Sequence, residues 1–112
     1  MWGLSALSDR AENSDRDLYS GLIRLHILHH AVKAPIFGLG MLEELERHGY
    51  KISPGTLYPL LHGLEQKGYL GHGRNGMGAR DGGSSVPRQK GRQALLAAKR
   101  KIRELFVEIV GE

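Results

Sequence analysis

The sequence contains no cysteine among its 112 residues. Disulfide bonds, a thiolate nucleophile and a zinc site built from cysteine are therefore excluded, and the absence fits a reducing compartment. Aromatic residues make up only 6% of the chain. No apolar run approaches the roughly 20 residues that cross a bilayer, and nothing resembles a signal peptide. We therefore expect a soluble, cytoplasmic protein that makes no contact with a membrane.

The length predicts one domain with a small core, and dimerisation would add buried surface to it. Residues 1–14 mix small and charged side chains without a period, which predicts a flexible N-terminal tail.

Acidic residues are almost missing from one long segment of the chain, 66–103. Between Gln66 and Arg103, Asp81 is the single acid, whereas ten residues are basic: Lys67, Arg74, Arg80, Arg88, Lys90, Arg92, Lys99, Arg100, Lys101 and Arg103. Such a block can neutralise phosphates and release counterions, which gives affinity for nucleic acid independent of base sequence. A solvated basic surface is the alternative reading of the same residues.

The most informative stretch runs from Ile52 to Gly68 and reads I-S-P-G-T-L-Y-P-L-L-H-G-L-E-Q-K-G. Ser53 is a favoured N-cap residue whose hydroxyl can accept from a backbone N–H of the first turn, and Pro54 suits the first helical position. A buried stripe follows at helical spacing, formed by Leu57, Leu61 and Leu64. The opposite face carries small and hydrogen-bonding residues, which suits close approach to another polar surface: Gly55, Thr56, Tyr58, Pro59 and His62.

Two further helices are predicted before this stretch. The first begins near Asp15 or Asp17 and ends near Val32, with a broad apolar face that includes Leu18 and Leu22. The second covers 37–47, with Phe37, Met41, Leu42 and Leu45 directed inward. Residues 49–52 then form the short connection that is typical of a helix-turn-helix.

Three histidines of the first helix, His26, His29 and His30, are spaced so that at least two could reach one metal ion. Two helical histidines rarely suffice without further ligands, and the helix offers no cysteine and no H-E-x-x-H arrangement. We therefore predict a packing or hydrogen-bonding role, no metal site and no cofactor.

The segment after Gly68 predicts a short strand over 69–72 and a weak return strand. Glycine is abundant between 71 and 83, and Pro87 cannot donate a ladder hydrogen bond, so the second strand should be short, edge-like or absent.

The last helix is predicted over 89–110. Its apolar residues step by three and four, as in the seam of a coiled coil, at Leu95, Ala98, Ile102, Leu105 and Ile109, with Leu96, Phe106 and Val110 beside them. An internally packed amphipathic helix is one interpretation; a dimer interface is favoured, because long exposed apolar stripes usually mark interfaces.

The motif S-P-G-T-L-Y-P-L-L-H-G-L-E-Q-K-G-Y-L, from Ser53 to Leu70, resembles the recognition helix of the PadR family of transcriptional regulators. The similarity continues upstream from Leu25 to Leu45 and downstream from Lys90 to Leu95. It implies a mainly α fold: a winged helix-turn-helix with a short or degenerate β wing (15–88), followed by a C-terminal dimerisation helix (89–112).

The same resemblance implies a cytoplasmic homodimer that binds double-stranded DNA, most often as a repressor that responds to a small-molecule effector. The residues expected at the DNA are Lys51, Ser53, Thr56, Tyr58, Lys67, Arg74 and Arg80. The residues expected at the dimer interface are Leu95, Ala98, Ile102, Leu105, Phe106 and Ile109.

Two other function classes stay open at this point. One is a protein-interaction adaptor whose degenerate wing has lost DNA binding; it would show no salt-dependent binding to any duplex. The other is an enzyme, which we do not predict, because the sequence shows no catalytic constellation of nucleophile, base and orienting group.

Overall fold

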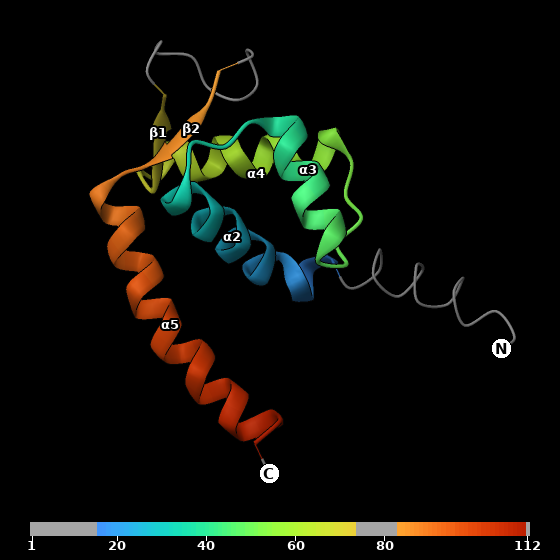
Figure 1. Cartoon of the computed structure of the whole chain (residues 1–112), viewed down its shortest axis with the longest axis vertical. Coiled ribbons are helices and arrows are strands. Elements are labelled where there is room, and N and C mark those ends of the chain that lie inside the picture. Colours follow the sequence, from blue (N-terminus) through green and yellow to red (C-terminus); the bar gives the residue numbers. More distant parts are fainter. Residues whose placement is uncertain (1–15, 74–82, 112) are drawn as a thin grey trace, which may run out of the picture.

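The computed structural model describes residues 16–73 and 83–111. Along the chain the elements are α2 (Arg16–Lys33), α3 (Gly38–Arg47), α4 (Pro54–Gln66), β1 (Leu70–His72), β2 (Ser85–Pro87) and α5 (Gln89–Ile109). Figure 1 shows α2, α3 and α4 gathered beside the small sheet, while α5 extends away from them. This confirms the predicted mainly α fold with a short wing. The predicted tail (1–14) lies outside the described residues, as do Arg74 and Arg80 in the wing.

The core lies within the three-helix unit of α2, α3 and α4 and extends to β1 and to the first turns of α5. Its members come from every helix and from β1, and the predicted stripe of α4 is fully included: Ile23, Ile27, Leu28, Ala31, Ile36, Met41, Leu45, Leu57, Leu61, Leu64, Leu70 and Leu95. The helical period read from the sequence therefore selects the buried face of α4 correctly.

Both helices of the helix-turn-helix end in the same way, at a Gly-Tyr pair. Gly49 after α3 and Gly68 after α4 have φ of 92° and 84°, values that favour glycine. The tyrosine that follows each glycine donates its backbone N–H back into the helix, Tyr50 to Leu45 at 2.9 Å and Tyr69 to Leu64 at 3.0 Å. These bonds satisfy terminal carbonyls and turn the chain sharply.

The wing is a two-stranded antiparallel sheet in which Leu70 pairs with Pro87 and His72 with Ser85. The second strand is short, as predicted. Its other edge is also used, since Ile36 exchanges backbone hydrogen bonds with Ser85 (3.0 and 2.8 Å). The fully buried Ser85 donates its hydroxyl to Glu65 Oε2 at 3.1 Å, which ties the wing to α4.

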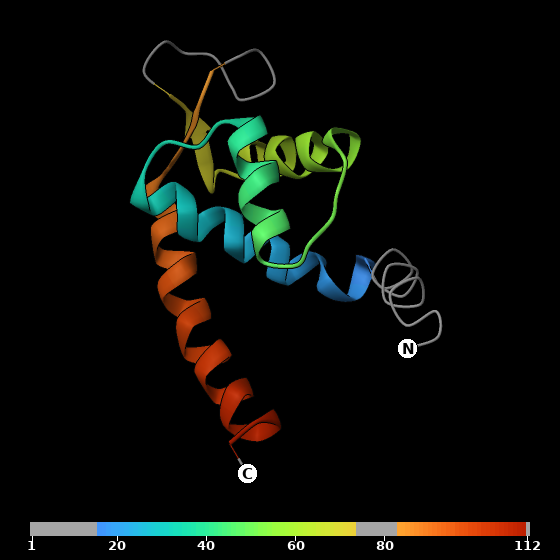
Figure 2. The same ribbon diagram turned by 45° about the vertical axis from the view of Figure 1, so that its right-hand side comes forward.

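Helix α5 begins with a close contact to Tyr69, the residue before β1. A Cβ at Gly91 would overlap the carbonyl oxygen of Tyr69, so only glycine allows the first turn to lie there. From this point α5 packs along α2 for its first turns and then leaves the rest of the chain (Figure 2).

Three apolar residues expected in the core are exposed instead. Leu18 and Leu22 lie on the open side of α2. Phe37 is the N-cap of α3, with an extended backbone (φ −115°, ψ 147°), so its side chain does not follow the helical period. Leu95 differs from expectation in the opposite way. The sequence predicts it at the dimer interface, but it is only 7% exposed and belongs to the protomer's own core. Among residues 16–73 and 83–111, no helix combines the length and apolar character needed to cross a membrane.

Candidate nucleic-acid interface

The outer face of α4 is a small, uncharged surface. Ser53, Gly55, Pro59 and His62 are exposed along it, and Thr56 is half-buried. Because the leucine stripe of α4 is buried on the other side, this face is the exposed one. Its low bulk would let the backbone of α4 come close to a DNA groove.

Ser53 occupies the N-cap position of α4, as predicted, but its hydroxyl makes no capping bond. The carbonyl oxygen of Ser53 accepts the first helical bonds from the N–H groups of Thr56 and Leu57, at 3.0 and 2.9 Å. The hydroxyl lies 3.5 Å from Thr56 Oγ1. The start of the helix therefore presents two adjacent hydroxyl groups at the surface.

Tyr58 has a structural role that the sequence did not reveal. Its ring lies against Gly38, the first residue of α3, where a Cβ would overlap the phenol. The side chain is half-buried and packs on the core. Tyr58 thus joins the two helices of the helix-turn-helix, and a contact from it to DNA stays a prediction.

The predicted flanking lysines are both exposed, Lys51 in the turn before α4 and Lys67 at its C-terminal end. Other members of the basic block are engaged within the protein. Lys90 donates to the carbonyl oxygen of Lys67 at 2.7 Å and lies 4.7 Å from the ring centroid of Tyr69. The Arg88 guanidinium lies close against Gly71 in β1. These contacts position α5 and the wing relative to α4.

The predicted dimer residues divide into two groups. Leu95 is buried and Ala98 half-buried within the protomer. Beyond them the apolar residues of α5 are exposed, from 42% at Ile102 to 68% at Ile109, with Leu105 and Phe106 between these values. A groove of about 310 Å³ runs between α2 and α5 beside this surface, lined by Leu22, Leu25, His26, His29, Leu95, Lys99 and Ile102.

Comparison with known proteins agrees with this geometry. Residues 27–81 match the family described as the transcriptional regulator PadR-like family. The chain is 41% identical over 96 residues to the transcriptional regulator Rv3488 of Mycobacterium tuberculosis, covering 86% of this chain and 90% of that protein.

Two solved structures share the fold. One is a PadR-like transcription factor from Bacteroides fragilis, with a TM-score of 0.69, 21% identity, and coverage of 87% of this chain and 95% of that one. The other is a PadR family transcriptional regulator from Eggerthella lenta, with a TM-score of 0.68, 22% identity, and coverage of 94% and 93%.

The three-helix unit and the two-stranded wing define a winged helix-turn-helix fold. More particularly, the chain belongs to the PadR-like family of transcriptional regulators.

Proposed function

We propose that this regulator binds a palindromic operator as a homodimer and represses transcription until a small-molecule effector is bound. The observation that carries the proposal is the apolar surface of α5 from Ile102 to Ile109, which the protomer leaves exposed. A second copy is the partner that suits it, because a stripe with steps of three and four residues is complementary to itself in a two-fold dimer.

A dimer would place two copies of α4 on one DNA duplex. One recognition helix reads only a few base pairs, while two helices held about 34 Å apart read both halves of a palindrome within one molecule. Base or backbone contacts in the major groove are assigned to Ser53, Thr56 and Tyr58. Phosphate contacts are assigned to Lys51 and Lys67, with Arg74 and Arg80 adding wing contacts to the backbone.

The groove between α2 and α5 supports an effector site near the dimer interface. Its lining is mainly apolar, with His29 and Lys99 at its edge. Phenolic acids and cationic aromatic compounds are the classes to screen by thermal shift, because a flat ring fits an apolar groove and a charged group can reach its polar rim. Absence of a shift with either class would favour a regulator without a ligand.

Selection of duplexes from random DNA tests the central proposal. We expect an enriched palindrome whose half-sites lie about one helical turn apart, bound with an affinity that falls steeply with salt. A reporter downstream of that palindrome should be expressed more strongly when the regulator is absent. Failure to enrich any duplex, together with no salt-dependent binding, would favour the protein-interaction adaptor.

A further inference from the structure

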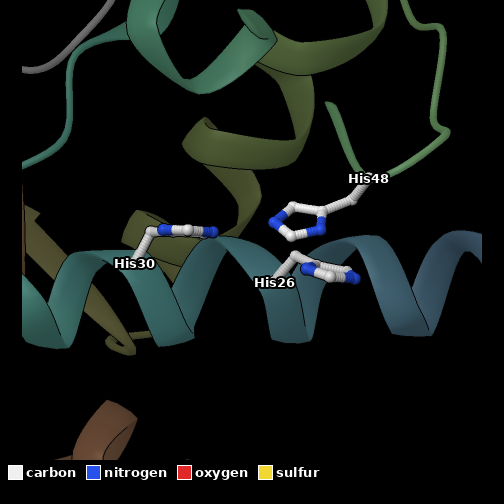
Figure 3. A group of neighbouring side chains, drawn as sticks. All are labelled: His26, His30 and His48. Carbon is white, nitrogen blue, oxygen red and sulfur yellow. The ribbon is translucent and has the colours of Figure 1, made fainter. Parts of the chain in front are cut away.

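Three histidines from two separate elements meet beside the helix-turn-helix. His26 and His30 project from successive turns of α2, and His48 follows the last residue of α3 (Figure 3). One ring nitrogen from each of the three lies within 4.8 Å of the others. The sequence indicates only the two ligands of one helix; the third comes from a residue 18 positions further along the chain.

The backbone fixes these three side chains in place. A separation of four residues puts His26 and His30 on one face of α2. His48 is the C-cap of α3, and its N–H donates to the carbonyl oxygens of Glu44 and Leu45 at 3.3 and 3.0 Å. The His48 ring centroid lies 4.9 Å from that of His26 and 5.8 Å from that of His30.

The hydrogen-bonding capacity of this cluster is not filled. Nε2 of His30 is buried and has no hydrogen-bond partner among the described residues. The Oε2 atom of Glu44 is 4.0 Å away, too far for a hydrogen bond but close enough to place a negative charge beside the cluster. A buried ring nitrogen without a partner costs stability, and an ion bound there would use it.

The surroundings also favour imidazoles with a free lone pair. Burial lowers the pKa of His26, and the neighbouring His48 lowers it further. Burial likewise lowers the pKa of His30, although Glu44 opposes that change. A metal ion binds the neutral imidazole, so a lowered pKa reduces competition from protons.

We propose that His26, His30 and His48 form a binding site for a divalent transition-metal ion of the Zn²⁺ type. Three imidazoles with one adjacent carboxylate suit Zn²⁺, Ni²⁺ or Co²⁺ and not Mg²⁺ or Ca²⁺, which prefer oxygen. Zinc–nitrogen bonds of about 2.0–2.1 Å require nitrogens about 3.4 Å apart in a tetrahedral site. The rings must therefore move together by at most about 1.4 Å, and the exposed His48 has room to rotate.

Such an ion would join α2 to the end of α3, at the first residue of the turn that leads to α4. It would restrict the angle between α2 and the helix-turn-helix and would stabilise the folded state. At free Zn²⁺ a hundred times its Kd, the thermal midpoint of the chain should rise by about 10 °C. The exposed side of His48 gives the ion a path from solvent.

Calorimetric titration of the full chain with ZnCl₂, in a buffer that does not bind metals, tests the site. The wild type should bind one ion per chain. His48→Asn and His26→Asn should each weaken binding by about 100-fold or more, since loss of an outer-shell partner alone typically costs 10–100-fold. Circular dichroism of the metal-free variants establishes that each is folded.

Two matched variants control for binding of Zn²⁺ to histidines outside the proposed site. His29→Asn removes an exposed histidine whose ring lies 5.2 Å from that of His30 but which is outside the set of three, and His62→Asn removes an exposed histidine of α4. Both should keep the wild-type isotherm and the rise in thermal midpoint. The proposal is overturned if the wild type takes up no ion, or if His48→Asn and His26→Asn bind as tightly as the two controls.

Discussion

The two halves of α5 carry the same apolar spacing but have opposite surroundings. In the first half, Leu95 is buried in the protomer core beside α2, and Gly91 touches the backbone of Tyr69. In the second half, every side chain from Lys99 to Ile109 is exposed, including the three large apolar ones of the predicted seam, Ile102, Leu105 and Ile109. One helix thus completes the protomer core at its start and offers a surface for another molecule at its end.

This difference shows that a periodic stripe identifies a buried face without identifying what covers it. A helix of 21 residues is about 32 Å long, whereas the protomer is thick enough to cover only its first turns. The length of α5 beyond the core, rather than its composition, determines where intramolecular packing ends.

The largest effect is expected from a charge in the exposed half. Leu105→Asp would place a carboxylate in an apolar seam in both subunits, at a cost of several kcal/mol in dimerisation free energy. Light scattering after size exclusion should show a monomer, and operator affinity should fall by about 100-fold or more, while helical content is kept. Val107→Asp, an equally exposed site away from the seam, is the matched control and should remain dimeric. A dimeric Leu105→Asp protein would mean that the protomers meet elsewhere.

The buried half should respond in the opposite manner. Leu95→Ala leaves a cavity in the protomer core and should lower the free energy of unfolding by about 2–5 kcal/mol, without changing the oligomeric state. Its exposed neighbour provides the control, since Leu96→Ala should change the free energy of unfolding by no more than about 0.5 kcal/mol. Denaturant titrations at one protein concentration measure both. Equal effects at the two positions would contradict the division of α5.

Tyr58 extends the comparison to α4, because its half-buried side chain combines a ring packed inside the protein with a hydroxyl that could reach DNA. Tyr58→Phe keeps the ring against Gly38 and removes only the hydroxyl. If that hydroxyl reads a base, discrimination between the selected operator and random DNA should fall by about 1–3 kcal/mol with unchanged stability. Tyr58→Ala should lose both discrimination and packing. If Tyr58→Phe binds the operator and random DNA with the same ratio of affinities as the wild type, Tyr58 has a packing role alone.

The smallest effect is expected from charges at the wing. Replacing Arg74 and Arg80 with glutamine should weaken binding similarly for all duplexes and reduce the salt slope by about 2. The same change at Arg100 and Arg103, in the exposed half of α5, is the control for loss of two charges and should leave the slope nearly unchanged. If the salt slope is the same in both double variants, Arg74 and Arg80 of the wing do not contact DNA.

The sequence by itself determined the fold class, the bounds of the helices and the recognition segment. Pro54 at the first helical position and the leucine stripe specify α4 through local rules of helix start and periodicity, and these rules depend only on neighbours along the chain. The positive φ of Gly49 and Gly68 likewise follows from helix ends that favour glycine. The short wing followed from Pro87, which cannot donate to a ladder.

Only the tertiary structure decided which distant residues meet. Leu95 belongs to the core because α2 lies beside it, and Tyr58 packs on Gly38 because α3 and α4 meet there. Ser85 is buried where Glu65 and Ile36 both contact it. The histidine site is the clearest case. Spacing along α2 places His26 beside His30, but His48 joins them through the packing of α3 on α2, since sequence periodicity describes the faces of one helix and not the distances between two.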